Sequence, residues 1–301
     1  MLDATIQISQ QDLLDIPFRI FLCGQDTLDE YSPLVLLLHG AGGDHLHFRS
    51  VWPILVKAGY RTITVDLRYH GRSQAEQIDF TKTTVTFQDM QADLEQALQW
   101  YKQEHAPNND AIKLIVGGLS MGSMLGQFCA KQWVSSLPQN GYQVHGFVGI
   151  GAPCIHLVWP RLEWMDLYRN ATTFDPATIQ ATKQAIIESA MHVDAQKETE
   201  RAVKLVNDYI LFQCLRACAE SLPPIPTEQR KIPEFDICPM HLPQLLLHGE
   251  TDEYTGKIME QWQIMNTQIG IKSRFVTILD AGHMIPLDQG ERVAEEIIKF
   301  F

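Results

Sequence analysis

Short apolar runs alternate along the chain with longer segments whose apolar residues recur at helical spacing. Residues 34–38 are an uninterrupted run of leucine and valine, and residues 60–67 are rich in β-branched side chains, as buried strands are. Residues 86–104 carry apolar side chains every three or four positions, which predicts a helix. A strand–helix rhythm of this kind is typical of a mostly parallel sheet covered by helices.

The complete pattern predicts an α/β protein with a mostly parallel, doubly wound sheet of about eight strands. The expected strands cover residues 5–9, 17–22, 34–39, 60–67, 112–116, 144–150, 244–248 and 274–279, the first two as an opening hairpin. The expected helices of this layer cover residues 48–58, 86–104, 123–134, 256–268 and 287–301.

The rhythm stops between about Cys154 and Cys238, where no strand pattern is visible. Asp175 followed by Pro176 predicts a helix start, because aspartate caps helices and proline suits their first position. Residues 195–219 predict one long amphipathic helix, and four prolines between positions 223 and 233 predict a stiff return connection. We therefore expect a core of residues 1–153 and 239–301, interrupted by a helical cap of residues 154–238.

Charge and composition exclude several classes of function. The 301 residues carry a net charge of −12 and show no basic stripe that could neutralise nucleic-acid phosphates. No apolar run approaches the length of a membrane span, and the first residues lack a signal-peptide pattern, so we expect a cytoplasmic protein. The sequence has no P-loop or dinucleotide-binding fingerprint, and we expect no cofactor. The oligomeric state is left open.

The pentapeptide Gly118–Leu119–Ser120–Met121–Gly122 lies between a predicted strand and a predicted helix. A sharp strand-to-helix turn needs glycine two residues before and after its central residue, because larger side chains would collide with nearby backbone. Such a turn lifts the serine hydroxyl off the end of the sheet. The pattern predicts that Ser120 is a catalytic nucleophile, with a simple helix cap as the alternative.

An acid and a histidine follow Ser120 in chain order, each directly after a predicted strand. Asp252 follows the strand at 244–248, and His283 follows the last strand. Ligand crevices form at these carboxyl ends of the strands in open α/β sheets. We expect His283 to take the serine proton and Asp252 to orient the imidazole and stabilise its protonated form. The rival acids are Glu250, Glu253 and Asp280.

The segment His39–Gly40–Ala41–Gly42–Gly43, after the third strand, can supply a backbone hydrogen-bond donor. Acyl transfer develops an oxyanion, which two preorganised N–H groups stabilise. We expect one N–H from Met121, directly after the nucleophile, and one from Ala41 in the glycine-rich loop. A plain glycine turn is the alternative.

Taken in order, these motifs resemble those of α/β-hydrolase-fold serine hydrolases over nearly the whole chain. The resemblance rests on His39–Gly40, Gly118–Gly122, His248–Asp252, Gly282–His283 and the 66–73 segment, which is similar to the D-x-R-G-H-G-x-S loop of that family. Tyr69 stands where the family has its first glycine. The resemblance implies an α/β-hydrolase fold, an esterase-like or lactonase-like activity and a helical lid. It also implies that Arg68 and His70 make structural hydrogen bonds near the floor of the site.

Residues in and near the cap are candidates for the substrate pocket. Trp159, Trp164 and Met165 belong to an aromatic and methionine cluster that either walls a pocket or forms the cap's own small core. His45 is a candidate for the pocket entrance. With its neighbour His47 it also invites a metal site. Their spacing does not match a zinc hydrolase loop, so we expect no metal.

These residues favour hydrolysis of a small-molecule carboxylic ester or lactone through an acyl-enzyme. The same triad can serve thioester hydrolysis or carbon–carbon cleavage of a diketone acid. The latter needs a cation for the substrate carboxylate, for which Arg161 and Arg169 are candidates. Cofactor-free peroxidase chemistry is a further hypothesis. A non-catalytic sensor of a small ligand is the last, and the intact triad disfavours it. The fold supports many chemistries, so the sequence does not specify the substrate.

Overall fold

The computed structural model describes residues 1–10, 13–74, 79, 83–155, 163–171, 173–222 and 240–301. Of residues 6–10, 13–16 and 163–166 it describes the backbone only. Within these ranges eight strands form one sheet, in the order β1-β2-β4-β3-β5-β6-β7-β8. The strands are β1 (Leu2–Gln10), β2 (Leu13–Cys23), β3 (Leu34–Leu38), β4 (Arg61–Asp66), β5 (Ile112–Leu119), β6 (Tyr142–Ile150), β7 (Gln244–Gly249) and β8 (Ser273–Ile278).

The direction of the strands confirms the predicted fold class. β1 pairs antiparallel with β2, and β2 pairs antiparallel with β4, so the opening hairpin forms one edge of the sheet. All the other neighbouring strands run parallel. The carboxyl ends of β3, β5, β6, β7 and β8 therefore meet at one edge, where an open α/β sheet places its ligand site.

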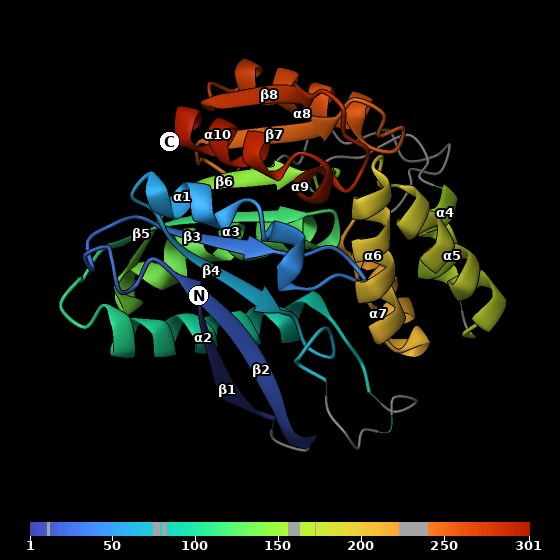
Figure 1. Cartoon of the computed structure of the whole chain (residues 1–301), viewed down its shortest axis with the longest axis horizontal. Helices are drawn as coiled ribbons and strands as arrows, with labels where there is room; N and C mark the ends of the chain where they lie inside the picture. The colour runs from blue at the N-terminus through green and yellow to red at the C-terminus, as the bar shows by residue number, and fades with distance from the viewer. Residues whose placement is uncertain (11–12, 75–78, 80–82, 156–162, 172, 223–239) are drawn as a thin grey trace.

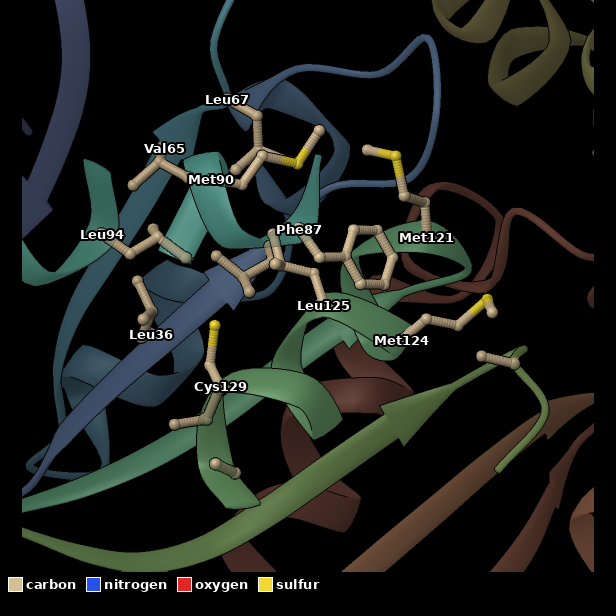
Figure 2. Close-up of a cluster of buried hydrophobic side chains, with 14 of the residues drawn as sticks. Leu36, Val65, Leu67, Phe87, Met90, Leu94, Met121, Met124, Leu125 and Cys129 are labelled. Atoms are coloured by element: carbon tan, nitrogen blue, oxygen red, sulfur yellow. The ribbon is translucent and has the colours of Figure 1, made fainter. Parts of the chain in front are cut away.

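Alternation of side chains along the central strands produces two cores, one on each face of the sheet. In β3, Leu36 and Leu38 face one core, whereas Val35 and Leu37 face the other. The first core is covered by α2 (Phe87–His105), α3 (Met121–Ser136) and α8 (Gly256–Gln268). The second is covered by α1 (Trp52–Lys57) and α10 (Gly290–Phe300). Figure 2 shows the first core where side chains of α2 and α3 gather over the sheet.

Four helices lie between β6 and β7 in the described part of the cap. They are α4 (Glu163–Asn170), α5 (Pro176–Glu188), α6 (Val193–Leu205) and α7 (Asp208–Ser221). They stand together beyond the carboxyl ends of the central strands (Figure 1). The cap thus covers the edge of the sheet at which the sequence places the candidate catalytic residues. No helix in the described ranges is long and apolar enough to cross a membrane.

The prediction of one long helix over residues 195–219 is wrong. The chain forms α6 and α7 instead, because Val206 adopts an extended conformation with φ −85° and ψ 130°. Asn207 then starts the second helix, since its side-chain oxygen accepts a hydrogen bond from the backbone N–H of Tyr209. The apolar spacing continues across the break, so periodicity alone does not reveal it.

Two other helices also differ from the prediction. Of the predicted helix at residues 48–58 only α1 (Trp52–Lys57) forms, and a separate 3-10 helix (His45–Phe48) precedes it. The closing segment contains α9 (Ile285–Asp288) followed by α10. In the closing segment Gln289 takes a non-helical conformation, with φ −139° and ψ 49°. This places Asp288 at the end of α9, where its half-buried carboxylate reaches neighbouring loops.

Side-chain caps fix the starts of α2 and α5, and the sequence predicts the second of these caps. The Asp175 carboxylate accepts hydrogen bonds from the backbone N–H groups of Ala177 and Thr178, which confirms the expected start of α5. At α2, Thr86 and Asp89 bond reciprocally to each other's backbone N–H, as a capping box does. These caps satisfy N–H groups that a helix cannot satisfy internally.

Tyr69 occupies a left-handed backbone position, with φ 63°, which explains why related loops have glycine there. Its side chain is nevertheless buried in the first core. For Tyr69→Gly we expect relief of about 1–2 kcal/mol of backbone strain. Loss of the buried ring costs about 3–5 kcal/mol, so the variant should be less stable overall. A Tm below that of wild type and below that of Tyr69→Phe, which keeps the buried ring, would show this. A higher Tm for Tyr69→Gly would contradict it.

Candidate active site

Ser120 stands on the turn between β5 and α3 in a strained conformation, with φ 53° and ψ −117°. Its backbone N–H donates to the carbonyl of Ile150 at the end of β6, 2.9 Å away. A Cβ on Gly118 would clash with the backbone of Gly122, and a Cβ on Gly122 would clash with the carbonyl of Leu38. Both glycines of the pentapeptide are therefore required by close backbone contacts, as predicted.

The structure brings Asp252 and His283 together. Nδ1–H of His283 donates to Oδ2 of Asp252 across 2.8 Å, and the Asp252 side chain is fully buried. The same carboxylate accepts a hydrogen bond from the Thr255 hydroxyl at 2.6 Å and from the Tyr254 backbone N–H at 2.9 Å. Neither of these two supporting donors is predicted from the sequence. Their only signal is the short spacing after Asp252, which is common in turns where aspartate bonds to its own backbone.

The charges of this pair stabilise each other. Burial lowers the pKa of His283, but the negative charge and the hydrogen bond of Asp252 outweigh burial, and the pKa of His283 lies above its usual value. Burial raises the pKa of Asp252, yet the attraction of His283 and three hydrogen bonds hold it well below its usual value. At neutral pH Asp252 is therefore a carboxylate that can fix the tautomer of His283.

Two of the rival acids, Glu250 and Asp280, have other partners. Glu250 accepts a hydrogen bond from the backbone N–H of Asp280, and the Asp280 carboxylate pairs with His192. In the described part of the chain, Asp252 alone forms an ion pair with His283. The geometry therefore favours Asp252 over Glu250 and Asp280 as the partner of the histidine.

Gly151 connects the Ser120 turn to the Asp252–His283 pair. It directly follows Ile150, the residue whose carbonyl accepts the Ser120 N–H. A Cβ on Gly151 would lie 3.2 Å from Nδ1 of His283 and 3.4 Å from Oδ2 of Asp252. The end of β6 thus lies between the Ser120 turn, which follows β5, and the Asp252–His283 pair, whose residues follow β7 and β8. No hydrogen bond joins the Ser120 hydroxyl to His283 among the described residues, and such contacts commonly tighten only when substrate binds.

The loop after β3 passes beside Ser120. A Cβ on Gly40 would lie 3.3 Å from Cβ of Ser120, which shows how closely the loop approaches the serine. The backbone N–H groups of Ala41 in this loop and of Met121 at the start of α3 have no acceptor among the described residues. Two N–H groups therefore remain available near the serine, as an oxyanion hole requires.

Two buried histidines hold this loop in place. His39 accepts the backbone N–H of Leu67 at Nε2 (3.0 Å), so its proton is on Nδ1, which donates to the carbonyl of Gly40 (2.8 Å). His70 accepts the N–H of Gly42 at Nε2 (3.3 Å) and donates from Nδ1 to the carbonyl of Arg68 (2.9 Å). Both rings are neutral, because burial lowers the pKa of His39 to about 4 and that of His70 to about 3.

The fixed carbonyl of Gly40 determines where the next N–H points. In a trans peptide the C=O and the following N–H point in opposite directions. Since His39 binds the Gly40 carbonyl on one side, the Ala41 N–H is directed to the other side. The predicted structural role of His70 is confirmed by its contacts, and Arg68 likewise makes two short bonds of 2.7 Å to the Asp93 carboxylate.

Helix α6 of the cap lies against the same loop. Arg201 of α6 bonds to the Asp44 carboxylate at 2.6 Å, and Glu198 of α6 pairs with Arg49 at 2.9 Å. A Cβ on Gly42 would lie 3.1 Å from the side chain of Val203. Helix α6 is thus fixed against the loop after β3, which contains Ala41.

His45 lies in the core and not in the described cavity of the site. Its Nδ1 bonds to Oδ1 of Asp66 at 2.8 Å, and its ring stacks on Phe21 with centroids 3.4 Å apart. The backbone N–H of His45 binds the same Asp66 oxygen, also at 2.8 Å. These contacts give His45 a structural position beside Asp66 and Phe21.

Five candidate residues come from the first part of the cap. Trp159 and Arg161 lie outside the described residues, and Trp164 and Met165 lie in α4, whose backbone alone is described there. Arg169, at the end of α4, donates to the carbonyls of Ala219 and Leu222 at the end of α7. It thereby caps α7, a role that competes with binding a substrate carboxylate. No group of three or more potential metal ligands occurs in the described ranges.

A cavity of about 280 Å³ opens beside His283, between the end of α5 and the loop after β7. Glu188 and Met191 line it on the cap side, and Glu253 and Tyr254 line it on the sheet side. The Tyr254 ring stands edge-on to His283, with centroids 6.1 Å apart. The described lining includes two carboxylates besides Asp252, and no lysine or arginine.

The sequence that builds these strands, the Ser120 turn and the loop carrying His283 matches a known family. Residues 35–296 match the sequence profile of the Alpha/beta hydrolase family. The chain belongs to this family. As an alpha/beta hydrolase, it carries its Ser120 turn, Asp252 and His283 at the strand ends of a recognised fold. No curated protein sequence matches the chain significantly.

Solved structures resemble this alpha/beta hydrolase over nearly its full length. A thermophilic esterase from Thermogutta terrifontis has 19% identity and a TM-score of 0.67, with 99% of this chain and 97% of the esterase covered. A bromoperoxidase from Bacillus anthracis has 15% identity and a TM-score of 0.67, with 99% of each chain covered. An enol-lactonase from Burkholderia xenovorans LB400 has 15% identity and a TM-score of 0.63, with 95% of this chain and 96% of the lactonase covered. At such identities the likeness establishes the fold.

Proposed function

We propose that the protein hydrolyses a carboxylic ester or lactone of a small molecule through an acyl-enzyme. The observation that carries this proposal is the Ser120 turn beside the hydrogen-bonded Asp252–His283 pair. Neutral His283 removes the proton from Ser120 as the hydroxyl attacks the substrate carbonyl. The protonated His283 then gives that proton to the leaving alcohol. In the second step His283 takes a proton from water as the water attacks the acyl-enzyme. His283 then returns this proton to Ser120 as the acid leaves.

The oxyanion of each tetrahedral intermediate is bound by the N–H groups of Ala41 and Met121. His39 and His70 prepare this site by holding the Gly40–Gly42 backbone before substrate arrives. Preorganised donors of this kind stabilise the transition state because no reorientation is needed during the reaction. None of these steps requires a metal or a cofactor.

The charges of the described cavity favour a substrate without a carboxylate. Glu188 and Glu253 line the space beside His283, whose described lining does not include Ser120, and they would repel an anionic group that entered this space. Arg169, a candidate cation for a diketone acid, is engaged with the end of α7. An uncharged ester or lactone therefore fits better than the acidic substrate of a carbon–carbon hydrolase. The esterase and the enol-lactonase among the structural relatives support the same class.

Labelling with a fluorophosphonate probe tests the proposed nucleophile. We expect stoichiometric covalent labelling, and peptide mapping should place the adduct on Ser120 because only an activated serine reacts with this probe. The labelled protein should lose its hydrolytic activity in proportion to the label. Labelling of another serine, or no labelling of the folded protein, would refute the proposal.

A substrate panel tests the bond that is cleaved. Short and long neutral esters, lactones, thioesters and a diketone acid can be compared by pH-stat titration or absorbance, with a peroxidase assay alongside. We expect kcat/KM to be highest for a neutral ester or lactone. Cleavage of the diketone acid or thioester alone, or peroxidase activity without ester hydrolysis, would contradict the assignment of the bond.

A further inference from the structure

The turn between α5 and α6 of the cap, residues 189–192, is bonded directly to the loop that carries His283. The backbone N–H of His283 donates to the carbonyl of Ser189 across 2.8 Å. A Cβ on Gly282 would clash with the same carbonyl, so glycine permits this close approach. Ala190 is buried in the second core together with Ala281 and Met284, the residues on either side of this contact.

One carboxylate joins the two segments. Oδ2 of Asp288 accepts a hydrogen bond from the N–H of Gly282 at 3.0 Å and from the N–H of Met191 at 3.0 Å. Oδ1 accepts from the N–H of His192 at 2.9 Å. Met191 lies 97 positions away along the chain, so the carboxylate joins the cap to the histidine loop. Both side-chain oxygens of Asp288 act as acceptors in these contacts.

Other contacts support the same junction. Nε2 of His192 lies 3.0 Å from the carbonyl of Asp280, at the start of the histidine loop. On the opposite side, the N–H of Thr251 donates to the carbonyl of Ala281 at 3.1 Å, which joins the loop to the segment that carries Asp252. The histidine loop is thus held between the acid loop and the cap turn.

We propose that Asp288 is a positioning residue for His283, acting through Gly282 and the cap turn 189–192. The inference deepens the proposed function and rests on it, because His283 is there the general base. Asp288 touches neither substrate nor reacting atoms. It fixes the backbone on which the imidazole is mounted, and the α5–α6 end of the cap is therefore part of the catalytic support and does not separate from His283 during turnover.

Two substitutions separate this role from general stability. Asp288→Asn keeps the size of the side chain and one acceptor oxygen, but its amide nitrogen cannot accept the second set of N–H groups. Asp288→Ala removes both acceptors. A misplacement of about 1 Å can cost on the order of 100-fold in rate. We expect kcat to fall about 10- to 100-fold in Asp288→Ala and less in Asp288→Asn, with KM nearly unchanged.

The pH dependence of kcat/KM distinguishes a positioning role from a purely structural one. Loss of stability alone would leave the pH of its acidic limb unchanged. When the loop is loosened, the His283–Asp252 hydrogen bond weakens, and the acidic limb of kcat/KM should move to lower pH in both variants. All rates are normalised to active sites counted with the fluorophosphonate probe. Asp175→Ala is the matched control, because Asp175 also accepts two backbone N–H groups in the cap but does not reach the histidine loop. Asp175→Ala should have the same kcat as wild type and the same pH for the acidic limb of kcat/KM.

Nuclear magnetic resonance of ¹⁵N-labelled histidines tests the inference without relying on activity. The titration of His283 should shift to lower pH in Asp288→Ala, and its Nδ1–H signal should broaden or move. Unchanged titration together with an unchanged limb would overturn the positioning role, even where the fluorophosphonate still labels Ser120. If the probe fails to label wild type, the proposed function fails. The histidine titration then still decides whether Asp288 positions His283.

Discussion

Replacement of Ser120 by alanine is expected to reduce kcat for ester hydrolysis by on the order of 10⁴- to 10⁶-fold. The alanine has no hydroxyl to attack the carbonyl, and the remaining oxyanion donors accelerate only attack by water. The turn itself should survive, because its strained backbone is held by the Ser120 N–H bond to Ile150 and by Gly118 and Gly122. Substrate binding, measured with the intact ester, should persist.

Ser123→Ala is the matched control for this experiment. Ser123 lies three residues further along in α3, is fully buried, and belongs to none of the proposed catalytic groups. Its variant should keep activity near wild type and should still react with the fluorophosphonate. Retention of more than about 1% of kcat by a fully folded Ser120→Ala protein, with Tm equal to wild type, would exclude Ser120 as the nucleophile.

The sequence predicts the sheet well because each strand carries its own signal. Fully apolar runs such as residues 34–38 are buried on both faces, and the alternation of Leu36 and Leu37 between two cores shows why neither face is polar. The Ser120 turn is equally readable, since close backbone contacts at Gly118 and Gly122 leave no alternative residue. Local chemistry of this kind is visible in one segment of chain.

Contacts between distant segments leave no comparable signal. Asp288 acts on backbone N–H groups, which every residue except proline has, so nothing in the 189–192 turn reveals its partner. The position of His45 beside the Gly40–Gly43 loop makes it a pocket candidate in the sequence, whereas in the structure its ring is buried and bonded to Asp66. The division between α6 and α7 depends on the conformation of Val206, which amphipathic spacing on both sides conceals.

Asp252→Asn should separate the two contributions of the carboxylate to His283. An amide that donates to Nδ1 favours the tautomer with its proton on Nε2, which cannot accept the serine proton. We therefore expect kcat to fall on the order of 10³- to 10⁴-fold. Glu250→Gln, in the same loop but bonded to the Asp280 backbone, is the control and should remain near wild type.

The pH dependence of the residual activity measures how the charge of Asp252 affects the pKa of His283. His283 works as a base only when neutral, so activity is lost as pH falls through its pKa. In wild type, Asp252 raises the pKa of His283 above 6.5, and the acidic limb of kcat/KM should lie above that pH. In Asp252→Asn burial remains and the stabilising charge is gone, so the limb should move to lower pH while the plateau falls. A limb that stays in place would mean that another group controls the ionisation of His283.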